Sequence, residues 1–164
     1  MATGDTLLIL TTLMNEPPAS AGASPDTRNA HAVLDFDAAA NENALFRGIL
    51  PRNYGGGGIT VYVHYAMSSA TTGSVIWNTA FERIGDGAQD IDADGFAAAI
   101  ALTHAVPATS GNVAVAALAH TNGAQIDSIV VGESFRLKVT RDAAAAGDDA
   151  TGDAELTAIE LKET

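Results

Sequence analysis

The stretch from 59 to 84, ITVYVHYAMSSATTGSVIWNTAFERI, decides the fold. In its first part Ile59, Val61 and Val63 alternate with polar or aromatic residues, and the same alternation resumes at Val75. A period of two places these apolar side chains on one face of an extended chain, which predicts strands of a half-buried sheet. Between them lies a run of small and polar residues that is typical of a turn.

The same alternation continues along the chain and predicts an all-β protein. It recurs in NVAVAALAH (112–120), in ESFRLKVTR (133–141) and, less regularly, in DAELTAIELKE (153–163). Glycine-rich turn signals separate these segments. Seven or eight short strands at nearly even spacing favour an antiparallel β-sandwich, similar to a jelly roll, with little helix.

Helix is expected in short pieces. One piece is predicted over 94–100, and a turn or two over 124–131. The Ala-rich segment 142–160 has helical composition, but Gly147 and Gly152 interrupt it, and a loop between two strands fits better.

The first 31 residues differ in composition from the rest. LLILTTLM (7–14) reads as a strand or an apolar anchor, and NEPPASAGASPDTRNAH (15–31) holds three of the five prolines. Proline excludes helix and favours extended backbone, so the latter segment is either a disordered linker or an arm that lies on a neighbouring subunit. We therefore expect an N-terminal strand with an extended Pro-rich arm at 1–31 and one β-sandwich domain at 32–164.

Composition excludes several functions. The formal net charge is −12, with 20 Asp and Glu against 8 Lys and Arg, so a nucleic-acid backbone would be repelled. Cysteine is absent, which removes thiolate nucleophiles and Cys-based zinc sites. The apolar segment 7–14 is too short to cross a bilayer and follows no basic residue, so we expect neither a membrane span nor an export signal.

The segment DIDADGF (90–96) resembles the start of a calcium loop, with Asp90, Asp92 and Asp94 at alternate positions. The acid required at the twelfth position is replaced by Ala101. The favoured interpretation is that these carboxylates cap the short helix at 94–100. The alternative is a weak calcium site that also uses Asp86.

No other pattern predicts catalysis, a metal or a cofactor. The histidines have no metal-ligand spacing, the serines lie in no nucleophile motif, and GGGG (55–58) precedes a strand instead of opening a phosphate-binding helix. Acids in the loop at 148–153 are expected to be solvated. The sequence thus predicts no catalytic, metal or cofactor-binding residues and a protein that is not an enzyme. The four histidines are His31, His64, His104 and His120.

Aromatic and arginine residues leave two further expectations. Tyr54, Tyr62, Tyr65 and Trp77 could form a sugar-stacking platform, but the alternation puts Tyr65 and Trp77 with core residues, and packing is the favoured role. Each arginine is expected to pair with a carboxylate, within or between subunits. These arginines are Arg28, Arg47, Arg52, Arg83, Arg136 and Arg141.

Several motifs resemble a family of tailed-bacteriophage and prophage virion proteins. They are the Pro51-Arg52-Asn53-Tyr54 turn, Phe81-Glu82-Arg83, and Arg136 to Asp142 followed by an acidic loop. The resemblance covers roughly residues 26 to 163 and brings no catalytic residues. It implies a capsid decoration, or cement, protein that stabilises the outside of the shell.

The resemblance also implies partners and a location. These are the major capsid protein and further copies of the chain, as a homo-oligomer and most simply a trimer, on the virion surface after synthesis in the host cytoplasm. The alternative is a tail, baseplate or fibre domain that binds host-surface glycan.

Overall fold

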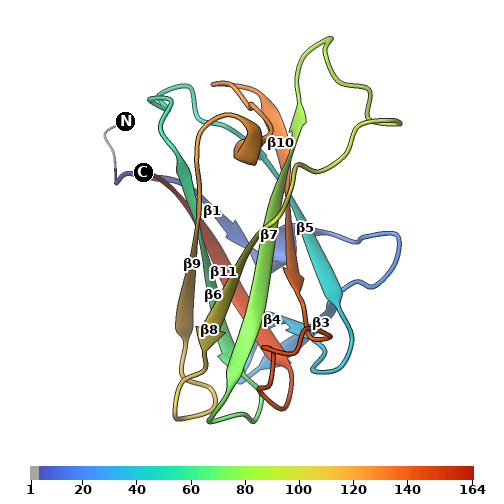
Figure 1. The fold of residues 1–164 in the computed structure, drawn as a ribbon, viewed down its shortest axis with the longest axis vertical. Coiled ribbons are helices and arrows are strands. Elements are labelled where there is room, and N and C mark those ends of the chain that lie inside the picture. Colours follow the sequence, from blue (N-terminus) through green and yellow to red (C-terminus); the bar gives the residue numbers. More distant parts are fainter. Residues whose placement is uncertain (1–3) are drawn as a thin grey trace.

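The computed structural model describes residues 4–164, which form two antiparallel sheets packed face to face (Figure 1). Sheet A has six strands: β3 (Ser24–Arg28), β4 (His31–Phe36), β11 (Ala154–Glu163), β6 (Ile59–Met67) and β9 (Ala114–His120) in spatial order, with β1 (Thr6–Thr11) also on β11. Sheet B has five: β2 (Asn15–Glu16), β5 (Glu42–Ile49), β10 (Ser134–Arg141), β7 (Ser74–Ile84) and β8 (Ile100–Ala105). The predicted all-β sandwich is confirmed.

The core lies between the sheets and is built from the alternating positions of β6, β7 and β10. Trp77 is fully buried, and its ring meets Phe36 and Tyr65 edge-on, with ring centroids 5.1 and 5.3 Å apart. Such edge-to-face contacts stabilise the fold beyond the contribution from burying these three large side chains. The predicted core role of Trp77 and Tyr65 is therefore confirmed.

The N-terminal segment differs from the expected extended arm. β1 pairs along β11, and β3 forms a hairpin with β4 at the edge of sheet A. Leu10 is 1% exposed because it faces the core. Proline causes no conflict at Pro25, since an edge strand leaves one side of its backbone unpaired. Residues 4–31 are thus part of the sandwich.

The short helical elements follow the expectations only in part. No helix forms at 94–100, because the chain there runs extended into β8 and the N–H of Ala97 donates to the carbonyl of Phe81 at 2.8 Å. A single 3-10 turn, η2 (Ala124–Ile126), stands where one or two turns were expected, and another, η1 (Thr12–Met14), follows β1. The segment 142–153 is a loop, as predicted.

The long loop between β7 and β8, residues 85–99, is fixed to sheet B by an aromatic contact. The charged groups of Arg136 and Lys138 lie over the ring of Phe96, at 5.1 and 4.6 Å from its centroid. Cations are attracted to the negative face of an aromatic ring.

Among the described residues no helix is long and apolar enough to cross a membrane.

Candidate functional site

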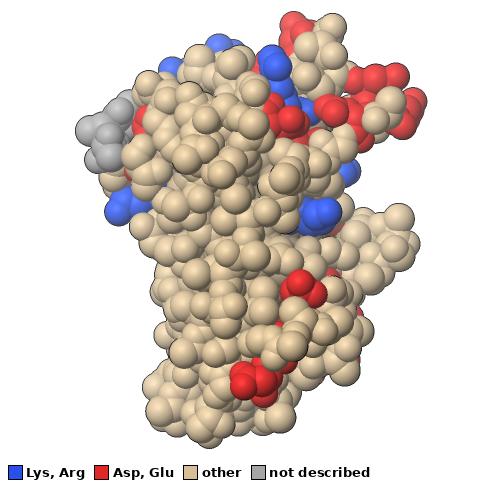
Figure 2. Space-filling view, in the orientation of Figure 1, with Lys and Arg blue, Asp and Glu red and all other residues tan. Residues whose placement is uncertain are grey.

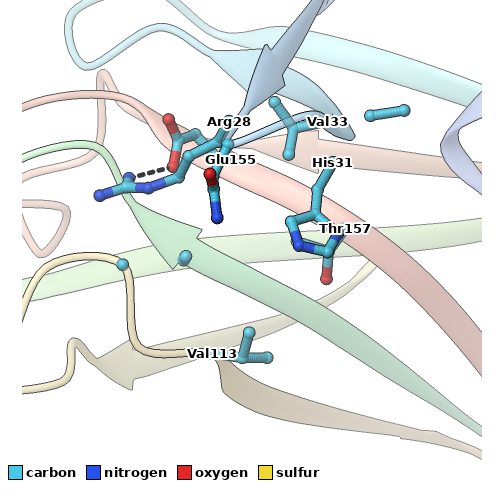
Figure 3. A pocket seen from close by; sticks show the side chains of 10 residues that line it. Arg28, His31, Val33, Val113, Glu155 and Thr157 are labelled. Atoms are coloured by element: carbon cyan, nitrogen blue, oxygen red, sulfur yellow. Dashed lines mark hydrogen bonds and ion pairs between the residues drawn. The ribbon is translucent and has the colours of Figure 1, made fainter.

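A hollow of about 490 Å³ opens on the outer face of sheet A, near the turn between β3 and β4 (Figure 3). Its lining combines a charged pair, a histidine and small apolar side chains. Figure 3 shows Arg28 and Glu155 at one end, His31 and Thr157 at the other, and Val113 across from them. Six of the lining residues are Arg28, His31, Val33, Val113, Glu155 and Thr157.

The hairpin of β3 and β4 brings Arg28 and His31 together. The two residues between them, Asn29 and Ala30, have φ of 46° and 64°, a left-handed conformation that reverses the chain in two residues. Arg28 and His31 are paired across the hairpin. Their side chains consequently lie on the same face of sheet A, together with outward residues of β11.

Arg28 is held in place by three neighbours. Its guanidinium forms an ion pair with Glu155 on β11 and donates to the carbonyl of Met67 at 2.9 Å. Gly111 lies beneath it, with a φ of 82°, and a Cβ there would lie 2.8 Å from Arg28 Nη2. The glycine therefore provides both the turn and the space that the guanidinium occupies.

Carboxylates cluster behind this ion pair. Burial, followed by repulsion from Glu155, Asp26 and Asp153, raises the pKa of Asp35 on β4 to about 6. Arg28 neutralises Glu155, which is 11% exposed, while Arg28 itself is 36% exposed. The hollow thus presents a partly exposed cation backed by negative charge.

His31 and Thr157 differ in the hydrogen bonds that they already make. The Thr157 hydroxyl donates to the carbonyl of His64 at 3.0 Å. Within residues 4–164 the ring of exposed His31 has no hydrogen-bond partner. Its two nitrogens are free to donate and accept, beside the methyl groups of Val33 and Val113. Hydrogen-bond donors and acceptors beside an apolar patch suit a ligand with many hydroxyl groups.

The residues singled out in the sequence do not meet at this hollow, apart from Arg28 and His31. Asp90 and Asp94 instead bond to nearby backbone: Asp90 Oδ1 accepts from the N–H of Asp92 at 3.0 Å, and Asp94 Oδ1 from that of Gly95 at 2.9 Å. The expected helix cap is wrong, because no helix follows these acids. No group of three or more His, Asp or Glu among the described residues is arranged to hold a metal ion.

His104 and His120 have structural contacts. His120 is 1% exposed and lies 2.8 Å from the Thr79 hydroxyl, and His104 lies 2.9 Å from that of Tyr65. Burial lowers the pKa of His120 and that of His104.

No aromatic platform forms, because Tyr65 and Trp77 face the core. Tyr54 lines a smaller hollow, of about 280 Å³, with Asn122 and Val130. The arginine prediction is confirmed for five residues: Arg28 pairs with Glu155, Arg47 with Glu16, Arg83 with Glu133, Arg136 with Glu82 and Arg141 with Asp148.

Comparison with known proteins defines the class of fold. No protein-family model and no curated protein sequence matches the chain. Among solved structures it is similar to the carbohydrate-binding module CBM6cm-2 of Cellvibrio mixtus lichenase 5A in complex with cellotriose, with 11% sequence identity over 98% of this chain and 99% of that one and a TM-score of 0.52. The fold is thus that of a jelly-roll β-sandwich of this kind.

Two further modules align over most of their length at lower scores. They are CBM35 of Cellvibrio japonicus Abf62, with 12% identity, 94% and 91% coverage and a TM-score of 0.49, and the xylan-binding domain CBM22-1 of Paenibacillus barcinonensis Xyn10C, with 11% identity, 99% and 97% coverage and a TM-score of 0.42. Scores this low carry no weight of their own.

The predicted capsid decoration function is wrong. The structural match is to a carbohydrate-binding module and not to a virion structural protein. The alternative expectation, a domain that binds glycan, agrees better with this finding. A match to a binding module is also consistent with the prediction that the chain is not an enzyme.

Proposed function

We propose that the chain is a non-catalytic module that binds carbohydrate, and that the hollow lined by Arg28, His31 and Glu155 is its binding site. The observation that carries the proposal is the composition of this hollow. A fixed guanidinium–carboxylate pair, a histidine with no hydrogen-bond partner within residues 4–164 and two valines share one concave surface.

Each part of the hollow matches a feature of a sugar. Vicinal hydroxyl groups accept and donate at once, and the Arg28–Glu155 pair offers N–H donors beside carboxylate acceptors. The imidazole of His31 supplies another donor and acceptor. Val113, which is 57% exposed, offers apolar contact to the C–H face of a pyranose ring, a role that aromatic residues would otherwise fill.

The jelly-roll likeness supports the proposal without naming a ligand. The similar module was solved with cellotriose, so this type of sandwich can carry a glycan site. The virion location expected from the sequence stays a prediction, in which this chain would attach a particle to host-surface glycan.

Titration calorimetry with soluble β-glucans, xylans, galactans and bacterial lipopolysaccharide O-chains tests the proposal. We expect micromolar to millimolar binding of at least one class, weakened about tenfold or more by His31→Ala, which corresponds to about 1.4 kcal/mol. His64→Ala is the matched control, because His64 lies outward on β6 of the same sheet but does not line the hollow. Absence of binding to the whole panel, or equal loss in both variants, would contradict the proposal.

A further inference from the structure

The side of the sandwich formed by β8 and β9 has no charge. Residues 95 to 126 contain no Asp, Glu, Lys or Arg, in a chain whose net charge is −12. This segment supplies all of β8 and β9, the strands that end sheet B and sheet A on the same side. In Figure 2 the surface over these strands, at the lower left, is tan throughout.

The outward side chains on this side are small or apolar. On β9, Val115 is 42% exposed, although valine is usually buried. The remaining exposed positions of the two strands are Ala101, Thr103, Ala105, Ala117 and Ala119. We call this surface, from 100 to 105 and from 114 to 119, the uncharged side.

On the opposite side of the sandwich, the last strands in the two strand orders, β3 and β2, are protected against pairing, and the uncharged side is not. β3 carries Pro25, Asp26 and Arg28, and β2 is only two residues long and is followed by Pro17. Proline, charge and shortness are the means by which proteins prevent an edge strand from pairing with another chain. β8 and β9 contain none of them, so their outer backbone groups can pair with an added strand.

We infer that the uncharged side binds a second copy of this chain, with the two β9 strands side by side and antiparallel. The net charge of the chain favours a second copy as the partner at this surface. Two molecules of net charge −12 repel each other, and the repulsion is smallest where neither carries a charge. A twofold contact also needs a surface that is complementary to itself, which small side chains beside an open strand edge provide.

The size of the uncharged side sets the strength of the association. A strand of seven residues is about 23 Å long, and two sheets stand about 10 Å apart, so the strip covers on the order of 230 Å² on each partner. A typical stable interface buries about 800 Å² on each partner, and we therefore expect a weak dimer, with a dissociation constant on the order of hundreds of micromolar.

The pairing would place two glycan sites on one side of the dimer. The axis that relates two antiparallel strands runs perpendicular to their sheet, so both outer faces of sheet A point the same way. This consequence rests on the proposed function, whereas the association itself does not. A multivalent glycan would then bind the dimer with higher avidity than it binds the monomer.

Sedimentation velocity of the whole chain, without glycan, tests the inference at concentrations from about 1 to about 500 μM, a range that spans weak dimers. We expect a monomer–dimer equilibrium that added salt strengthens, because screening reduces the repulsion. Thr103→Lys and Ala117→Lys are expected to raise the dissociation constant at least tenfold. The control, Thr27→Lys, puts the same charge on the protected edge strand β3 and is expected to leave it unchanged.

Each variant adds a positive charge to an acidic chain and so lowers the overall repulsion, which makes loss of the dimer specific to the surface. Circular dichroism confirms that the variants fold. A wild-type chain that stays monomeric throughout, or a dimer that survives both substitutions, would overturn the inference. A monomer whose glycan affinity falls with Ala117→Lys would assign the uncharged side to the glycan and overturn it as well.

Discussion

Arg141 and Asp148 form an ion pair, 2.8 Å between Nη2 and Oδ1, in which neither side chain is exposed to solvent. Arg141 also donates to the carbonyls of Phe36, Ala150 and Gly152, at 3.2, 3.0 and 2.9 Å. A buried guanidinium is tolerated because these acceptors and the carboxylate replace water. The pair fixes the loop at 142–153 to the end of the core.

The first prediction concerns this pair. Asp148→Asn leaves the guanidinium without its counter-charge, and we expect the free energy of unfolding to fall by about 3–5 kcal/mol. Glu16→Gln is the control, because its partner Arg47 is 50% exposed and such surface pairs contribute about 0–1 kcal/mol. Urea unfolding measures both. Equal losses would mean that the burial of the Arg141 pair has no energetic consequence.

The second prediction concerns pH. The pKa of Asp35 is about 6 in the folded chain against an ordinary value of 3.8, so the folded chain binds this proton more tightly. The resulting stability is fully present below about pH 3.8 and is lost as the pH rises through 6. Asp35→Asn carries no charge at any pH, and we expect its stability relative to the wild type to be greater at pH 8 than at pH 4.

Two features make this comparison specific. The lowered pKa of His120 acts in the opposite direction, since protonating it as the pH falls below 6.5 costs stability, so the difference between variant and wild type is the quantity to measure. Asp37→Asn is the control of opposite sign, because the backbone N–H groups of Ala39 and Ala40 lower the pKa of Asp37. A gain at pH 8 in both variants would assign the effect to net charge.

The third prediction concerns Gly48, which is paired with Phe135 between β5 and β10. A Cβ at this position would lie 2.6 Å from the end of the buried Phe135 ring. We expect Gly48→Ala to destabilise the fold by about 1–3 kcal/mol through overpacking. Gly95→Ala meets no atom within 4 Å and is expected to change stability by less than about 0.5 kcal/mol. Thermal unfolding of both variants checks the difference.

The fourth prediction concerns metal. The carboxylates of Asp90 and Asp94 accept backbone N–H groups of their own loop and do not converge on a common point. We expect excess EDTA, or added calcium, to leave the melting temperature unchanged within about a degree, because a ligand that does not bind the folded state cannot stabilise it. A shift of several degrees would restore a metal site at this loop.

The sequence predicted the strands with the clearest alternation. β6 and β7 lie within the predicted stretch 59–84, and β10 differs from the predicted segment 133–141 by one residue. β8 was missed because the Ala-rich run before it resembles a helix. Helical propensity is a local property and does not include the pairing of β8 with β7, which makes this segment a strand. β4 and β5 were missed as well, since their apolar residues do not alternate with a regular period of two.

The candidate site was not predictable, for a physical reason. It combines a hairpin turn at Asn29 with Glu155, a residue more than a hundred positions away, and only the pairing of β4 with β11 brings them together. The prolines at 17, 18 and 25 predicted an arm, although proline fits an edge strand equally well. A better signal was the two-residue turn, Asn29-Ala30, that separates Arg28 from His31.

Gly4 and Glu163 lie side by side, because the N–H of Gly4 donates to the carbonyl of Glu163 at 2.7 Å. The start of β1 and the end of β11 therefore lie at the same end of the molecule (Figure 1). A force that pulled these two points apart would act across the strands and not along them. The hydrogen bonds between β1 and β11 would then break one after another, starting at this end. That needs far less force than breaking all of them at once by shear. Tension would therefore peel away β1, with the buried Leu7 and Leu10, before it disturbed the hollow at Arg28.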